Sequence, residues 1–170
     1  KGFRLGIDPW LHTAAEVRRL EKALVSVGGE LVLLEANPLD AIWRDRPAEP
    51  LGRVSIQAAN VSGLLAREKI LDIANDLKKA DAAAVLITDP SSVAWVFNIR
   101  GSDVPHTPHP LSRALVRADG SAEIFLDKRK TGIEEEAYLA QLATQKSPGS
   151  FAAALAAIAA DGAKILIDPE

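Results

Sequence analysis

The sequence predicts an α/β domain in which helices lie on the faces of a mixed β-sheet. Short apolar stretches typical of buried strands alternate with stretches of helical periodicity along the chain. The pair Asp119-Gly120 lies between two further strand-like stretches and is a strong β-hairpin signal, so part of the sheet should be antiparallel. A chain of 170 residues, 48% hydrophobic and 25% charged, has the size and composition of one globular domain.

The chain begins with a predicted strand, helix and strand. Residues 3–7 alternate between apolar and polar side chains, which indicates a half-buried strand. Thr13 and Glu16 form a capping box, because each can satisfy a free amide of the first helical turn. The helix that they open is expected to end at Gly28-Gly29. Residues 31–34 are all apolar and are expected to form a buried strand beside the first.

A long loop is predicted at residues 37–52, with one helical turn near residues 39–43. Loops of this length inside a compact domain are usually functional or form interfaces. The remaining elements follow from local cap, turn and periodicity signals. They are a helix at residues 62–79 with Ile70, Ile73, Ala74 and Leu77 buried, a strand at 83–87, a short helix capped by Asp89-Pro90 with Val93, Val96 and Phe97 buried, hairpin strands at 111–118 and 121–126, a helix from a capping box at 131–134 to Leu142, a helix after Ser147-Pro148 with Phe151, Ala154, Leu155 and Ile158 on one face, and a buried strand at 164–167.

Composition excludes several classes of function. The net charge is −3, whereas nucleic-acid binding needs a clustered basic surface. No stretch approaches the roughly 18 apolar residues of a membrane span, so neither nucleic acid nor a membrane is expected as partner. The sequence contains no cysteine, which excludes disulfides and fits a reducing cytoplasm, the location we expect. It also contains no phosphate-binding glycine motif, no H-E-x-x-H zinc motif and no G-x-S-x-G nucleophile motif.

One polar segment, residues 98–109, has enough chemistry to be weighed as a site. A Ser-Asp-His triad from Ser102, Asp103 and His106 is disfavoured, because all three share one short loop and nothing supplies an oxyanion site. A metal site would join His106 and His109 to Asp103 and to a ligand from elsewhere, but the neighbouring prolines splay the histidines apart. The favoured interpretation is a structural loop whose Arg100 and Asp103 pair with each other or with a neighbouring domain.

The tryptophans are open to two interpretations. Trp43 and Trp95 could line a ligand pocket, and Trp10 could form an interface. A tryptophan beside a proline-rich loop is more often a packing residue. The aromatic residues alone therefore identify no function.

Three segments together resemble one protein family. Residues 95–106 read WVFNIRGSDVPH and resemble the W-x-F-N-x-R-G-S-D-V-x-H segment of the middle domain of three-domain Xaa-Pro aminopeptidases, or aminopeptidases P. Residues 6–11, GIDPWL, are similar to the opening strand and turn of that domain. Residues 37–47, NPLDAIWRDRP, are similar to its N-x-x-D-x-I-W-x-D-R-P loop. The three segments occur in the family's order and cover the chain as far as His106.

The resemblance implies a fold like the creatinase and prolidase amino-terminal domains. Residues 1–170 would then be a single, excised middle domain, without the amino-terminal domain and the carboxy-terminal catalytic metallopeptidase domain. It further implies a parent hydrolase that removes an amino-terminal residue preceding proline, with two divalent metals, expected to be manganese, in the absent catalytic domain. A metal-bridged hydroxide would attack the scissile carbonyl there. No catalytic, cofactor-binding or metal-binding residue is therefore assigned to this chain.

The resemblance also implies partners for this chain. These are its own amino-terminal and catalytic domains, proline-containing peptides bound by the parent, and a second copy in a homodimer. Loops 37–50 and 98–109 are expected to face the neighbouring domains and to shape access to the active site. The residues proposed for this interdomain or substrate-access role are Trp95, Asn98, Arg100, Ser102, Asp103 and His106.

Three alternatives to this interpretation stay open. The chain could be a free-standing binding module of the same fold without peptidase activity, since fold does not fix function. The parent could be creatinase-like or prolidase-like. A self-sufficient metalloenzyme using His106 and His109 is the least favoured.

Overall fold

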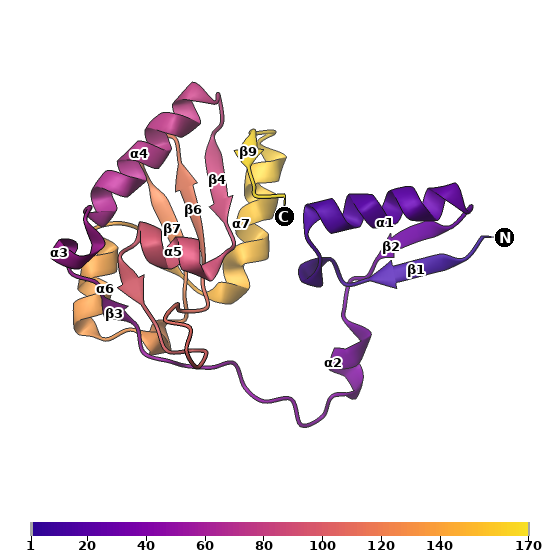
Figure 1. The fold of residues 1–170 in the computed structure, drawn as a ribbon, viewed down its shortest axis with the longest axis horizontal. Helices are drawn as coiled ribbons and strands as arrows, with labels where there is room; N and C mark the ends of the chain where they lie inside the picture. Colours follow the sequence, from indigo (N-terminus) through magenta and orange to yellow (C-terminus); the bar gives the residue numbers. More distant parts are fainter. Residues whose placement is uncertain (1, 170) are drawn as a thin grey trace. The chain divides into compact units, whose positions relative to one another are not determined.

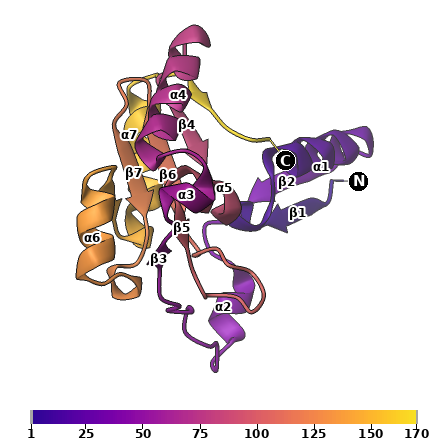
Figure 2. The ribbon, with the colours of Figure 1, turned by 60° about the vertical axis from the view of Figure 1, so that its left-hand side comes forward.

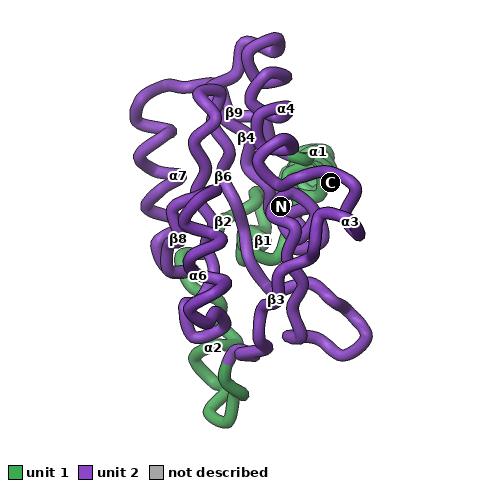
Figure 3. The backbone as a smooth tube through the Cα atoms, turned by 90° about the vertical axis from the view of Figure 1, so that its left-hand side faces the viewer, with its two compact units in different colours: residues 1–48, 168–170 green, residues 49–167 purple. Residues whose placement is uncertain are grey.

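A computed structural model describes residues 2–169. Within this range, residues up to 48 and from 168 onward form one compact unit, unit 1, and residues 49–167 form a second, unit 2 (Figure 3). Each unit is described by itself. The single domain expected over residues 1–170 stays a prediction.

Unit 1 is a small β-α-β arrangement. Its two strands pair in parallel, with Arg4 opposite Glu30 and Ile7 opposite Leu33. The capping box predicted at its helix is confirmed: Glu16 N donates to Thr13 Oγ1 at 3.2 Å, and Thr13 N donates to Glu16 Oε2 at 2.9 Å. Its elements are β1 (Arg4–Ile7), the 3₁₀ turn η1 (Pro9–Leu11), α1 (Ala14–Ser26), β2 (Glu30–Leu33) and α2 (Pro38–Ile42).

Unit 2 contains a five-stranded mixed sheet in the order β8-β7-β6-β4-β9. The inner pairs β4·β6 and β6·β7 are antiparallel, and the outer pairs β7·β8 and β4·β9 are parallel. A separate antiparallel pair joins β3 to β5. The elements are β3 (Ser55–Ile56), α3 (Ala59–Ser62), α4 (Ala66–Lys79), β4 (Ala84–Ile87), α5 (Pro90–Val96), β5 (Ile99–Arg100), β6 (Arg113–Arg117), β7 (Ala122–Phe125), η2 (Lys128–Lys130), α6 (Ile133–Ala140), β8 (Thr144–Lys146), η3 (Pro148–Ser150), α7 (Phe151–Ala160) and β9 (Ile165–Leu166).

Helices cover both faces of this sheet, so unit 2 has three layers (Figure 1, Figure 2). Side chains alternate along β6: Ala114 and Val116 pack with α4, α5 and α6, whereas Leu115 packs with α7 on the other face. Phe125 and Phe151 meet edge to face on the α7 side, with ring centroids 5.1 Å apart. The predicted mixed sheet with helices on its faces is confirmed, and the helix face of Ile70, Ala74 and Leu77 is buried as expected.

Several boundaries differ from the predictions. The helix expected at residues 62–79 begins later, at Ala66, and ends at Lys79. A separate short helix ends at Ser62, before Gly63, whose φ of +80° is incompatible with a continuous helix. The second capping box lies one residue later than predicted: Gly132 N donates to Glu135 Oε2 at 2.9 Å, and the helix ends at Ala140. The strands β2 and β9, which were expected to be buried, are partly exposed. The short strands β3, β5 and β8 were not predicted, because two or three residues leave no periodicity to detect.

Candidate functional site

The predicted loop connects α5 to β6 and includes the short strand β5. It begins at Asn98, which is buried and has a φ of +50°. Asparagine tolerates this left-handed conformation better than most residues. Gln57 N donates to the Asn98 carbonyl oxygen at 2.7 Å, and Asn98 Nδ2 donates to the Leu64 carbonyl oxygen at 2.8 Å. Asn98 therefore fixes the direction in which the chain leaves α5.

A buried lysine stabilises the turn at Asn98, where the chain leaves α5. Lys69 of α4 is 2% exposed, and its Nζ donates to Asn98 Oδ1 at 2.7 Å and to the Trp95 carbonyl oxygen at 2.8 Å. The same Nζ lies 4.2 Å from the centroid of the Trp95 ring, within cation–π range. Burial, with a smaller contribution from the charge of Arg100, lowers the pKa of Lys69 below its usual value. Lys69 thus ties the backbone and the ring of Trp95 to the start of the loop.

Asp103 anchors the middle of the loop. Its carboxylate accepts from Gly52 N at 2.9 Å and from Leu111 N at 2.6 Å, and it forms an ion pair with Lys130 Nζ at 2.7 Å. Both side chains of this pair are almost fully buried. Every oxygen of the carboxylate has a donor, which is the condition for a buried charge to be tolerated. Asp103 is a structural clamp that joins three separate segments of unit 2.

Two glycines allow the close packing around this clamp. A Cβ placed on Gly52 would lie 2.3 Å from the carbonyl carbon of Ser102. A Cβ placed on Gly101 would lie 2.6 Å from the nitrogen of Pro110. Any larger residue at either position would have to displace backbone, so these glycines permit the loop to lie against its neighbours.

The tip of the loop is a turn at residues 104–107. Thr107 N donates to the Val104 carbonyl oxygen at 3.1 Å, and His106 takes the left-handed conformation with a φ of +61°. Pro105 precedes it, as is common in turns that need a positive φ at the next position. Ser102 and His106 are both exposed. These two predicted residues are therefore available to a partner but are not held together.

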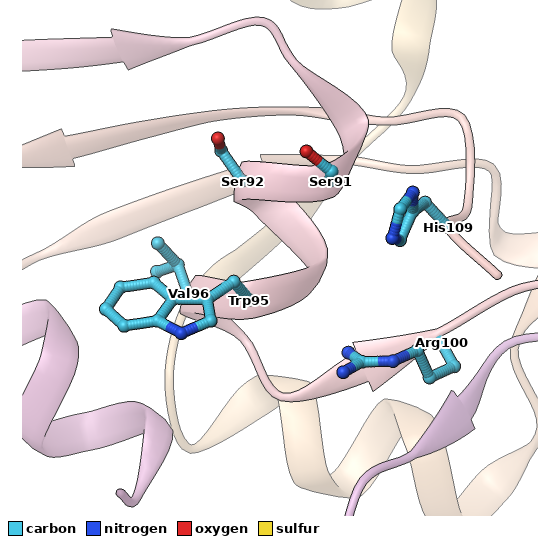
Figure 4. A pocket seen from close by; sticks show the side chains of 6 residues that line it. All are labelled: Ser91, Ser92, Trp95, Val96, Arg100 and His109. Atoms are coloured by element: carbon cyan, nitrogen blue, oxygen red, sulfur yellow. The ribbon is translucent and has the colours of Figure 1, made fainter. Parts of the chain in front are cut away.

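A pocket of about 500 Å³ opens between α5 and the loop. Figure 4 shows Ser91 and Ser92 on α5, with Arg100 on β5 and His109 on the loop. Trp95 is 53% exposed at one side of the pocket, whereas Val96 is buried. We call this the Trp95–Arg100 pocket; it is lined by Ser91, Ser92, Trp95, Val96, Arg100 and His109.

The α5 side of the pocket is organised by Asp89. Its carboxylate accepts from Ser92 N at 2.9 Å and from Ser92 Oγ at 2.8 Å, and also from the amide and hydroxyl of Ser91. These hydrogen bonds, that of the Ser91 hydroxyl foremost, lower the pKa of Asp89 to about 2. Asp89 is thus ionised at neutral pH, and both serine hydroxyls donate hydrogen bonds to its carboxylate.

The geometry decides among the chemistries weighed from the sequence. The pairing of Arg100 with Asp103 is wrong, because Asp103 pairs with Lys130 instead. The triad fails for the same reason: the Asp103 oxygens are occupied by groups other than a histidine. Within residues 2–169, no group of three or more His, Cys, Asp or Glu side chains could hold a metal ion, so no such group forms around His106 and His109. None of the helices in that range is long and apolar enough to cross a membrane.

Sequence reasoning missed Lys69 and Lys130. Lys69 could have been found from the sequence, because helical spacing places it on the same buried face of α4 as Ala66, Ile70 and Leu77, where a lysine is unusual. Nothing in the sequence indicates that Lys130 is buried, because it ends a basic run, residues 128–130, of a kind that is usually exposed. The other predicted loop has exposed contacts in unit 1. Arg46 Nη1 pairs with Asp40 Oδ1 at 2.6 Å, and Arg46 Cζ lies 5.9 Å from the centroid of the Trp43 ring.

Comparison with known proteins gives a consistent result. Residues 45–170 match the family described as the creatinase/prolidase N-terminal domain. The chain is 34% identical to aminopeptidase P2 of Arabidopsis thaliana over 171 residues, which cover 99% of the chain and 24% of that protein. It is 36% identical over 139 residues to a probable Xaa-Pro aminopeptidase P of Arthroderma gypseum, covering 81% of the chain and 22% of the relative.

A solved structure gives the same likeness in three dimensions. The X-prolyl aminopeptidase of Caenorhabditis elegans, described as a cytosolic enzyme with a di-nuclear active site, superposes with a TM-score of 0.86 at 26% identity. The match covers 98% of this chain and 28% of that one. The chain therefore spans about a quarter of the length of the relatives that it matches.

Proposed function

The chain belongs to the creatinase/prolidase N-terminal domain family, and from this premise we propose that it is a non-catalytic part of an Xaa-Pro aminopeptidase. In this proposal the parent removes an amino-terminal residue preceding proline. The single observation that carries the proposal is coverage: the relatives match nearly all of this chain with about a quarter of their own length. The remaining length would hold the catalytic domain.

We assign the position of middle domain to unit 2. The family match begins at residue 45, close to residue 49, where the contacts divide the chain. Unit 1 is then the part of the parent that leads into the middle domain. This assignment departs from the expectation of one excised middle domain over residues 1–170, which had included residues 6–11 and 37–47.

The parent would use two divalent metals, with manganese as the expected ion, bound in its catalytic domain. The di-nuclear site of the C. elegans enzyme supports metal dependence, and its description as cytosolic supports a cytoplasmic location. Assembly as a homodimer belongs to the same proposal.

The role proposed for the loop is to support domain packing and to shape access to the active site. Three features support this role: the Asp103–Lys130 clamp, the Lys69–Asn98 corner, and the exposure of Trp95, Ser102 and His106. A loop anchored at two points presents its exposed side chains in a preorganised form, which lowers the entropic cost of binding.

The test is the Arg100→Ala variant of the full-length protein that contains this chain. With Xaa-Pro peptides as substrate, we expect kcat/KM to fall about tenfold, because a charged hydrogen-bond donor near the access route is lost. Arg67→Ala is the matched control, since Arg67 is exposed in the same unit and donates only a long bond to the Gly120 carbonyl oxygen. Unchanged kinetics in a stable Arg100 variant would contradict the access role.

The alternative is a free-standing module that binds peptides without cleaving them. A full-length protein that binds Xaa-Pro peptides but hydrolyses none in the presence of manganese would favour it.

A further inference from the structure

Two cations of unit 2 have little access to solvent and no carboxylate partner. Lys69 is buried and Arg100 is half-buried, yet neither has a carboxylate oxygen within 4.0 Å among residues 2–169. Lys130, which is equally buried, does have one in Asp103. Lys69 is satisfied within the protein by the Trp95 carbonyl oxygen, Asn98 Oδ1 and the Trp95 ring, whereas the Arg100 side chain donates within residues 2–169 to the Ile99 carbonyl oxygen alone. A cation removed from water is normally paired, so Arg100 indicates a place for an anion.

Arg100 is the cation of the two that opens to the Trp95–Arg100 pocket. One of its donors, Nη1, is used on the Ile99 carbonyl oxygen at 2.8 Å. The planar guanidinium has five N–H donors, so a bidentate face remains available for an acceptor. His109 lies on the same side of the pocket (Figure 4) and offers a further ring nitrogen.

The opposite side of the pocket has acceptors. Ser91 and Ser92 donate their hydroxyl protons to Asp89, so the oxygens present lone pairs to a ligand. These oxygens suit the N–H groups of a peptide. Trp95, which is 53% exposed, adds an apolar surface at one side of the pocket, which suits the carbon atoms of a side chain.

The charge of the pocket favours a carboxylate over a phosphate. Among the residues that line the pocket, Arg100 is the one with a permanent positive charge, and the chain as a whole is negative. A doubly charged phosphate would lack the clustered cations that such ligands need. A carboxylate carries one charge and matches the planar guanidinium.

We propose that the Trp95–Arg100 pocket binds the carboxylate of a peptide, with Arg100 as the bidentate partner and Trp95 beside the adjoining side chain. The inference rests on the proposed function, because it takes peptides as the ligands of the parent. It names a specificity site for peptides that carry a carboxylate beyond the proline. Either a chain end or a Glu side chain can supply that carboxylate.

The experiment is an NMR titration of the ¹⁵N-labelled 170-residue chain with three probe peptides. Ala-Pro-Ala carries a terminal carboxylate, Ala-Pro-Glu-amide carries only a side-chain carboxylate, and Ala-Pro-Ala-amide carries neither. The signals observed are the indole N–H of Trp95, assigned with Trp95→Phe, and the Nε–H of Arg100. We expect saturable shifts with one or both of the first two probes and none with the third; the probe that binds identifies the source of the carboxylate.

Variants decide whether Arg100 is the partner. Arg100→Gln should weaken binding about tenfold or more, because a charge-assisted pair becomes a neutral one. Arg100→Lys should bind at an intermediate level, since the charge is kept and the bidentate geometry is lost. Arg67→Gln, which makes the same charge change at an exposed site of the same unit, should bind like the unaltered chain.

Four results would overturn the inference. They are equal binding of the amide probe, unchanged binding by Arg100→Gln, tighter binding of inorganic phosphate, and no shift with either carboxylate up to the solubility of the probes. Because no hydrolysis is measured, the outcome is separate from that of the proposed function. A full-length protein without peptidase activity whose pocket still binds the carboxylate probes would contradict the function alone.

Discussion

The two units of the chain differ in how much apolar surface they bury. In unit 2, both faces of the sheet are covered, and residues such as Phe97, Ile124 and Leu139 have no exposed surface. In the described part of unit 1, the buried apolar residues are Ile7 and Leu24, whereas Trp10 and Leu33 remain more than half exposed. Two strands and one helix cannot enclose a core of their own.

This difference teaches that local signals and burial are separate requirements. Unit 1 has a complete capping box and a regular parallel strand pair, yet its strands gain little from the hydrophobic effect. Unit 2 has the same kind of local signals and adds a core and two buried polar anchors. Unit 1 should therefore depend on further protein for its stability, and unit 2 should not.

The largest expected effect is in amide hydrogen exchange of the 170-residue chain. The amides of β6 and β7 should exchange about 100-fold more slowly than those of β1 and β2, which corresponds to roughly 3 kcal/mol in opening free energy. In the full-length protein, the β1 and β2 amides should become protected. Equal protection of both units in the 170-residue chain would remove the distinction between them.

The next largest effect compares the ion pairs of the two units. Asp103→Asn leaves the Lys130 charge buried without its partner, so it should lower the free energy of unfolding of unit 2 by about 3–5 kcal/mol. The exposed Arg46–Asp40 pair of unit 1 is the control: Asp40→Asn should cost less than about 1 kcal/mol. Urea unfolding followed by circular dichroism measures both. Similar losses in the two variants would mean that the Asp103 pair is not the anchor that its burial indicates.

A smaller effect is expected at two cation–π contacts, one in each unit. Lys69→Met removes the donor to Asn98 Oδ1 and to the Trp95 carbonyl oxygen, and should cost about 1–3 kcal/mol. In unit 1, Arg46 lies over the exposed ring of Trp43, and Arg46→Met should cost less than about 1 kcal/mol. Thermal unfolding of both variants gives the comparison. An unchanged thermal stability of Lys69→Met would show that water replaces the lysine as a hydrogen-bond donor.

The smallest effect is at the helix caps and depends on pH. The folded-state pKa of Asp89 is lowered from 3.8 to about 2, so its stabilising contribution is present above about pH 4 and is lost as the pH falls through 2. Asp89→Ala should cost about 1 kcal/mol at pH 5 and less near pH 2. Thr13→Ala is the counterpart in unit 1 and should leave the unfolding of unit 2 unchanged at either pH. Urea titrations at the two pH values test this, and a pH-independent loss in Asp89→Ala would refute the ionic contribution.

Much of the fold was predictable because its signals are local. A capping box, an Asp-Pro pair and an Asp-Gly turn each act within four residues, so Thr13, Asp89 and Gly120 could be read directly. The face of α4 was also predictable, since helical periodicity places Ile70, Ala74 and Leu77 together. The candidate loop was first singled out by its polar residues, whereas its expected role in domain contact and substrate access came from its resemblance to a family.

What the sequence by itself determined is therefore the kind of each long element, the mixed character of the sheet and the position of the loop. The tertiary structure decided which side chains meet: Asp103 with Lys130, Lys69 with Asn98, and Gly52 with the backbone of Ser102. It also decided that the strands β2 and β9 stay partly exposed. The physical reason is the separation along the chain over which each interaction acts. Caps and turns act between neighbours in the chain, whereas burial and the pairing of buried charges depend on segments that only folding brings together.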